Sequence, residues 1–243
     1  MVLSRERYLE TLEREGEALA AAARGRLSLP VPTCPGWTVG DLLDHTGGVY
    51  RFWTQIATGM TDRSMVVREP GPAPELVVEW FEEGLARLTE TLGSADPDTP
   101  IWTWAPVEDP TVSWIIRRMA HETCVHRWDA QNAVGSPNSI ESEFAADGID
   151  ELLFVFLPAW PELHRGDGRT AHVHSTDAEG EWFVRMDDGN FTVTREHKKG
   201  DVALRAPAGD VLLALWERIP LTELEVLGDE SAAKTLIAGI DRT

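Results

Sequence analysis

The sequence predicts a two-domain α+β protein, in which an antiparallel four-helix bundle at residues 1–158 precedes a small α+β domain at residues 159–243. Hydrophobic residues recur at helical spacing through the first two-thirds of the chain, whereas a period of two dominates beyond Pro158. Four long helices joined by loops are typical of a bundle. A length of 243 residues is enough for two modest domains, each with its own core.

The helices of the first domain are predicted from strong helix formers and from capping signals. Thr38 is expected to cap the second helix, with Asp41 three residues later as the acid of a capping box. Five helical segments are expected, at about residues 3–26, 38–57, 74–93, 111–135 and 140–157.

The second domain is predicted from alternating apolar and polar residues. Residues 158–169, PAWPELHRGDGR, are expected to form an interdomain linker, and residues 187–190, DDGN, a hairpin turn. Strands are expected at about residues 169–175, 181–186, 191–195, 201–206 and 222–227, with helices at 208–218 and 229–240.

The charge of the chain argues against two classes of partner. The formal net charge is −19 at pH 7, and so acidic a surface repels nucleic-acid phosphates and anionic lipids. We therefore expect small-molecule partners, with no nucleic acid and no membrane. The opening residues, MVLSRERYLETLEREG, lack the apolar core of a signal peptide, and the apolar runs are too short to cross a bilayer. These features predict a cytoplasmic protein.

The string HETCVHRWDA in the fourth helix carries the main chemical signal. Glu122 and His126 are four residues apart and therefore share one face of a helix. An imidazole and a carboxylate are suitable ligands for a divalent ion such as zinc. Asp129 lies three residues beyond His126, where it can orient the imidazole through the ring nitrogen that does not bind metal.

This string does not fit the zincin motif of metalloproteases. That motif needs two histidines four residues apart, whereas His121 and His126 are five apart and lie on different helix faces. A third ligand must come from another segment, and His45 of the second helix is the natural candidate, because metal sites in bundles use inward side chains of facing helices. Spacing alone leaves the alternative open that these residues form an ordinary helix-surface pair and a hydrogen-bonded interior histidine.

Two longer strings, CPGWTVGDLLDHTGG and RRMAHETCVHRWDA, resemble the mycothiol-dependent maleylpyruvate isomerase family, which lies within the DinB-like metal-binding four-helix bundles. The likeness covers most of the chain, and the C-terminal segment is similar to the family's sterol-carrier-like second domain. The resemblance implies a divalent metal of the zinc type held by His45, Glu122 and His126, with water completing the shell. It also implies mycothiol, a low-molecular-weight thiol, as cosubstrate.

The resemblance further implies that an arginine of the second domain acts near the active site. Arg218, in LLALWERIP, occupies the position that matches this arginine best, and Arg205 is the second choice. Such an arginine could bind a substrate carboxylate through two hydrogen bonds. The expected activity is that of a metal-dependent thiol transferase or isomerase acting on a small electrophilic, carboxylate-bearing substrate.

Two other functions remain open at this stage. One is a non-catalytic protein that binds small molecules or lipids and carries a structural or vestigial metal. The other is a hydrolase that uses metal-bound water.

Several further residues carry weaker signals. His172 and His174 share one face of a predicted strand and could chelate a metal, although a solvated sheet face is the simpler interpretation. Cys34 is expected in a loop, with a redox role open, and Cys124 is expected to pack in the core. Most tryptophans are expected to serve packing, while four could line an apolar pocket: Trp37, Trp53, Trp102 and Trp104.

Overall fold

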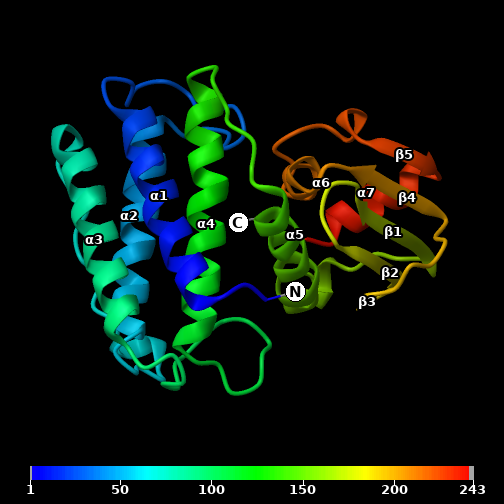
Figure 1. Ribbon diagram of the computed structural model, residues 1–243, viewed down its shortest axis with the longest axis horizontal. Coiled ribbons are helices and arrows are strands. Elements are labelled where there is room, and N and C mark those ends of the chain that lie inside the picture. The colour runs from blue at the N-terminus through cyan, green and yellow to red at the C-terminus, as the bar shows by residue number, and fades with distance from the viewer. Residues whose placement is uncertain (1, 241–243) are drawn as a thin grey trace. The chain divides into compact units, whose positions relative to one another are not determined.

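The structure is a computed structural model, and it describes residues 2–240. The described chain forms two compact units (Figure 1). The bundle unit contains residues 3–103 and 108–138, and the sheet unit contains residues 139–240 together with residues 2 and 104–107. The helices and the five-stranded sheet confirm the predicted α+β class.

Four long helices make up the bundle unit. Thr38 and Asp41 form the predicted capping box at the start of the second helix, where each side chain bonds to the backbone of the other residue. Within the described residues, no helix is both long enough and apolar enough to span a membrane. The helices are α1 (Arg5–Ala23), α2 (Val39–Ile56), α3 (Val77–Ser94) and α4 (Val112–Ala133).

Helices α1 and α4 lie side by side and run in the same direction. The ring of Tyr8 on α1 contacts that of His121 on α4, and further along both helices Glu15 pairs with Arg127. The buried Glu15–Arg127 pair therefore joins the two helices by charge as well as by apolar packing.

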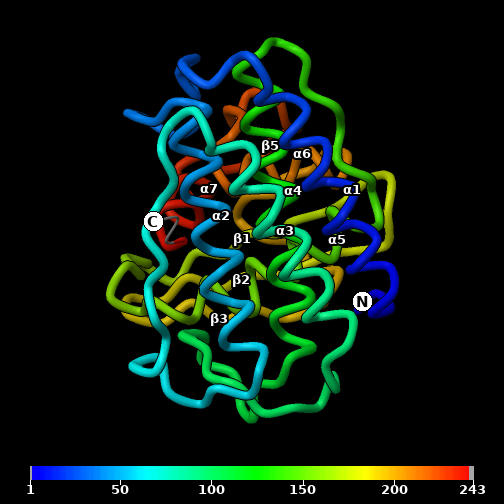
Figure 2. Tube along the Cα trace, turned by 90° about the vertical axis from the view of Figure 1, so that its left-hand side faces the viewer, coloured from blue at the N-terminus to red at the C-terminus, as the bar shows by residue number. Residues whose placement is uncertain are grey.

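Helices α2 and α3 are also parallel to each other. A side chain at Gly47 would collide with the ring of Trp80, and one at Gly84 would collide with the guanidinium of Arg51. These two glycines permit close approach of the helices. The parallel direction is possible because the connection at residues 57–76 runs back along α2 to the start of α3 (Figure 2).

The two parallel pairs oppose each other. His45 of α2 faces His126 of α4, while Tyr50 later in α2 bonds to Thr123 earlier in α4. The bundle is therefore antiparallel between the pairs and parallel within them, whereas the sequence analysis expected antiparallel packing throughout.

A mixed sheet organises the sheet unit. Its strand order is β3-β2-β1-β4-β5, with β1 and β4 parallel and all other neighbours antiparallel. The predicted DDGN turn is confirmed, because Asp187 pairs with Asn190 and Gly189 adopts φ of 72°. The strands are β1 (Arg169–Ser175), β2 (Glu181–Asp187), β3 (Asn190–Thr194), β4 (Val202–Ala206) and β5 (Glu225–Gly228).

Three helices complete this unit. They are α5 (Ser142–Glu151), α6 (Ala208–Leu215) and α7 (Glu230–Ala238). Ala171 and Val173 of β1 are fully buried on the sheet face that packs against helices, whereas His172 and His174 project from the opposite face.

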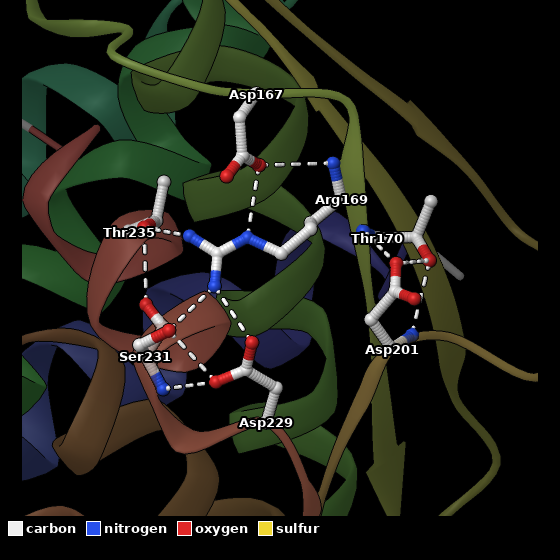
Figure 3. Close-up of polar contacts among 7 residues, drawn as sticks. All are labelled: Asp167, Arg169, Thr170, Asp201, Asp229, Ser231 and Thr235. Carbon is white, nitrogen blue, oxygen red and sulfur yellow. Dashed lines mark hydrogen bonds and ion pairs between the residues drawn. The ribbon is translucent and has the colours of Figure 1, made fainter.

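A polar cluster around Arg169 ties the start of β1 to its neighbours (Figure 3). The Arg169 guanidinium donates to Asp167 and to Asp229 at the start of α7, at 2.9 and 2.8 Å. The backbone N–H and the hydroxyl of Thr170 both donate to Asp201, just before β4, at 2.8 Å. These contacts join the start of the central strand β1 to the segment before β4 and to the start of α7.

The segment expected as an interdomain linker packs inside the sheet unit. His164 is 1% exposed, and its Nε2 lies 2.8 Å from the carbonyl oxygen of Leu157. Its Nδ1 accepts the backbone N–H of Phe191, whose ring stacks on the imidazole. Residues 158–169 are thus held by specific contacts.

Helix α5 also belongs to the sheet unit, whereas the sequence analysis grouped residues 140–157 with the bundle. The indole Nε1 of Trp182 donates to Asp150 of α5 at 3.1 Å, and Arg195 donates to the same carboxylate. The sheet unit consequently begins at Ser139 rather than at residue 159. Helical periodicity alone does not show which core an amphipathic helix joins.

Candidate metal centre

The bundle unit brings the three predicted ligands together. Helix α2 supplies His45, and one turn of α4 supplies Glu122 and His126. The Oε1 atom of Glu122 lies 3.7 Å from Nε2 of His45 and 3.4 Å from Nε2 of His126. One ligand atom from each residue lies within 4.8 Å of the other two. The antiparallel crossing of α2 and α4 creates this convergence.

These spacings fit a zinc-type ion. Tetrahedral ligands about 2.1 Å from zinc are separated from one another by roughly 3.4 Å. The two measured separations from Glu122 are therefore close to those of a bound set, and the donor types are those that zinc prefers. The His45 side chain is 39% exposed, at the edge of the buried helix face rather than inside the bundle as expected. This exposure leaves one side of the group open to small molecules.

Asp129 orients His126, as the sequence analysis predicted. Its Oδ2 lies 3.1 Å from Nδ1 of His126, and its side chain is fully buried. The Thr33 hydroxyl donates to the other carboxylate oxygen at 2.6 Å, and Cys34 Sγ lies 3.7 Å from Oδ2. With Nδ1–H held by Asp129, Nε2 of His126 points to Glu122 and His45.

The sequence analysis did not identify Arg118 as part of the site. Its buried guanidinium donates from Nη2 to Oε2 of Glu122 at 3.2 Å, which leaves Oε1 directed at the histidines. The sequence does contain a feature that predicts this contact, because Arg118 lies four residues before Glu122 and therefore shares its helix face. Thr33 was missed for a different reason, since it comes from a loop far away in sequence.

Close contacts within the metal centre shift the pKa values of Glu122 and His126. Burial raises the pKa of Glu122, but hydrogen bonds from His126 and His45 and the charge of Arg118 outweigh it and hold this pKa well below its usual range. Burial lowers the pKa of His126, whereas Asp129 and Glu122 raise it, with a net rise to about 9. In the metal-free protein at neutral pH, His126 is therefore protonated beside an ionised Glu122.

Comparison with known proteins connects this geometry to a family. The model for the mycothiol maleylpyruvate isomerase N-terminal domain matches residues 9–131, about half of the chain, and the model for the C-terminal domain matches residues 143–235. The chain belongs to the mycothiol-dependent maleylpyruvate isomerase family. All three candidate ligands lie within the N-terminal match. No curated protein matches the sequence.

Two solved structures share the fold of this family member. A crystal structure of mycothiol-dependent maleylpyruvate isomerase is 13% identical, covers 87% of this chain and 88% of its own, and has a TM-score of 0.59. A histidine-to-alanine variant of mycothiol-dependent maleylpyruvate isomerase is 12% identical with the same coverage and a TM-score of 0.61. The UbiJ-SCP2 ubiquinone synthesis protein is 24% identical and covers 39% of this chain and 86% of its own; its TM-score of 0.28 carries no structural argument.

The other residues that the sequence analysis considered lie outside the three-residue metal centre. His121 contacts Tyr8 on α1, as expected for a residue on another face of α4. Cys124 is buried, and burial raises the pKa of its thiol to about 12, which fits a packing role. Trp102 packs on Trp53, whereas Trp104 belongs to the sheet unit.

The second-domain arginines expected for the family lie in the sheet unit. Arg218 follows α6, and its Nη1 donates to the carbonyl oxygen of Trp216 at 3.0 Å. Arg205 on β4 forms an ion pair with Glu225 on β5 at 2.6 Å. The role of either arginine at the metal centre stays a prediction.

A groove beside His45 gives this family member space for a small molecule. It has a volume of about 780 Å³ and lies between α2 and the connection at residues 57–76. Trp37 and Trp53 contribute to its wall, and the Trp37 ring lies 4.8 Å from the imidazole of His45. Both tryptophans therefore line a groove, but charged side chains including Asp44 and Arg51 share its wall, so it is not the apolar pocket that the sequence suggested.

Zinc binding at this site is expected to release close to one proton per ion at about pH 7, because His126 must lose the proton on Nε2 to become a ligand. Affinity should rise with pH up to about 9, where the pKa of metal-free His126 lies, and then level off. Calorimetry in two buffers of different ionisation enthalpy counts the protons. A count of zero would show that His126 does not bind the metal.

Proposed function

We propose that this protein is a divalent-metal-dependent enzyme that uses a thiol of the mycothiol type as cosubstrate and acts as an isomerase or S-transferase. The observation that carries the proposal is the convergence of His45, Glu122 and His126 in a member of this family. The proposed substrate is a small electrophile that bears a carboxylate.

The chain's own residues explain how a metal would be held. His45 and His126 would bind through imidazole nitrogens and Glu122 through Oε1, while Arg118 restrains Oε2 and Asp129 holds the His126 ring. When bound, a zinc-type ion supplies the positive charge that favours a thiolate over a thiol at neutral pH. The exposed side of His45 and the adjoining groove leave room for the thiol to approach.

The reaction class follows from thiol chemistry. When a thiolate adds to one carbon of a cis double bond that is conjugated with a carbonyl group, the electron pair of the π bond moves onto that carbonyl as an enolate, and the substrate can rotate about the carbon–carbon single bond that remains. Elimination of the same sulfur then restores the double bond in the trans form and returns the thiol. In a transferase, the new carbon–sulfur bond is retained, either because the enolate takes up a proton or because another group leaves the attacked carbon with its electron pair.

We assign Arg218 to the substrate carboxylate, as the family resemblance implies. The preceding Glu217 adopts φ of 55°, the left-handed conformation that commonly ends a helix. The N–H of Arg218 bonds to the carbonyl oxygen of Leu213 at 2.7 Å, which closes the end of α6.

An assay with maleylpyruvate and mycothiol tests the proposal. We expect turnover that requires both thiol and metal, and a loss of at least about 100-fold in the rate when Glu122 is replaced by Gln. Arg218→Lys should mainly raise KM, because lysine keeps the charge but lacks the bidentate geometry. Ester or amide cleavage without thiol would instead indicate a hydrolase.

A further inference from the structure

A second cluster of metal-binding side chains lies in the sheet unit. His172 and His174 project from one face of β1, and Glu181 of β2 is paired directly opposite His174. The Glu181 carboxylate lies 3.2 Å from Nε2 of His172 and 2.8 Å from Nδ1 of His174. Ligand atoms from all three residues lie within 4.8 Å of one another. This cluster contains no residue of the candidate metal centre in the bundle unit.

The cluster is not the solvated sheet face that the sequence suggested. His172 is 8% exposed, and the side chains of His174 and Glu181 are only about a quarter exposed. Nε2 of His172 and Nδ1 of His174 both face the Glu181 carboxylate within this largely buried cluster. Two imidazoles and a carboxylate held in this way form a donor set that zinc prefers.

The contacts within the cluster do not satisfy His174 by hydrogen bonding. Its Nδ1 is buried and near the Glu181 carboxylate, yet it makes no aligned hydrogen bond. Nδ1 of His174 therefore lies beside the carboxylate without an aligned hydrogen bond to it, and an ion bound by both groups would satisfy this buried nitrogen.

His197 contacts Glu181 from outside the three-residue group. Its Nδ1 contacts Oε2 of Glu181, its ring lies 5.3 Å from that of His172, and its side chain is 82% exposed. His197 belongs to the connection between β3 and β4, whose Lys198 lies over the ring of Phe183. It is placed to fix the orientation of the carboxylate.

A neighbouring groove gives ions access to the cluster. The groove has a volume of about 760 Å³, and both Glu181 and His197 lie in its wall. The same wall includes Glu141, Glu143, Asp177 and Glu179. An excess of carboxylates raises the local concentration of cations.

We propose that His172, His174 and Glu181 form a second binding site for a divalent transition metal, of which zinc is the representative, and that His197 positions Glu181. The bound ion would hold β1, β2 and the connection between β3 and β4 together. This proposal does not depend on the proposed function, because the two candidate sites share no residue and lie in different units.

Zinc stoichiometry in a pair of matched variants tests the proposal. Untagged protein is dialysed against zinc at about pH 7, where the imidazoles can bind, and the zinc per chain is measured by elemental analysis. We expect two ions in the wild type, one in Glu181→Gln, one in Glu122→Gln and none in the double variant. Both substitutions keep the shape of the side chain and remove one carboxylate from one site.

The outcomes separate the two candidate sites. If Glu181→Gln binds as much zinc as the wild type, the second site is refuted, whatever Glu122→Gln does. A different outcome is that the wild type binds one zinc ion, Glu122→Gln also binds one, and Glu181→Gln binds none. That result would confirm the second site and refute the metal centre of the bundle unit. Circular dichroism verifies folding, and His174→Asn provides an independent variant that should also lose one ion.

The role of His197 has its own readout. His197→Ala should weaken zinc binding at this site by about 10-fold, as loss of an outer partner does. His197→Gln, whose amide can still donate to Glu181, should restore most of the affinity. The zinc affinity of both His197 variants is measured in the Glu122→Gln background, with Glu122→Gln itself as the reference. Equal zinc affinities in these three proteins would refute the positioning role of His197.

Discussion

Replacing Glu122 by glutamine is expected to weaken zinc binding in the bundle unit by at least about 100-fold. Loss of a residue that only hydrogen-bonds to a metal ligand already lowers metal affinity by about 10–100-fold, and Glu122 is itself a proposed ligand. Glu122 supplies the only carboxylate of the three-residue group, and its Oε1 faces both histidines. The amide that replaces it carries no charge and binds zinc poorly. Competition against a chromophoric chelator, in the Glu181→Gln background, measures this affinity alone.

The parent Glu181→Gln protein is the matched control for that experiment. It differs from the double variant only at position 122, and it keeps His45, His126 and Asp129. An affinity that is unchanged by the second substitution would show that Glu122 does not bind metal. It would also remove the main support for the proposed enzyme.

Glutamine at position 15 is expected to lower the free energy of unfolding by about 3 kcal/mol, the cost of breaking a buried ion pair by removing one partner. The Glu15 carboxylate contacts Nε of Arg127 at 2.5 Å, and the two side chains are only 10% and 4% exposed. The substitution leaves the Arg127 charge in the interior without this carboxylate. Urea denaturation of the metal-free protein measures the change.

Glu82→Gln is the control for the ion pair. Glu82 also pairs with an arginine, Arg24, but the two side chains are 41% and 53% exposed. Exposed pairs contribute about 0–1 kcal/mol, so this variant should unfold almost as the wild type does. Equal losses in both variants would mean that burial of the Glu15–Arg127 pair has no energetic consequence.

Local rules explain what the sequence could predict. The Thr38–Asp41 capping box, the Asp188-Gly189 turn and the common face of Glu122 and His126 each depend on residues within a few positions of one another. Backbone geometry determines such relations wherever the rest of the chain lies. No spacing rule connects α2 to α4, so His45 was predicted from the way bundle metal sites use inward side chains of facing helices, and the family resemblance then implied the same residue.

Features that depend on distant segments could not be predicted. The parallel direction of α2 and α3 results from the path of residues 57–76, and that path has no periodic signature in the sequence. Thr33 reaches Asp129 from a separate loop. Amphipathic periodicity likewise showed that α5 has an apolar face, but not that this face packs in the sheet unit.

Anomalous diffraction at the zinc absorption edge, from crystals grown with zinc, shows whether His45, Glu122 and His126 bind one ion. We expect a peak in the bundle unit about 2.0–2.2 Å from imidazole nitrogens of both His45 and His126 and from Oε1 of Glu122. Absence of a peak among these three side chains at saturating zinc would contradict the claim that they form a metal centre.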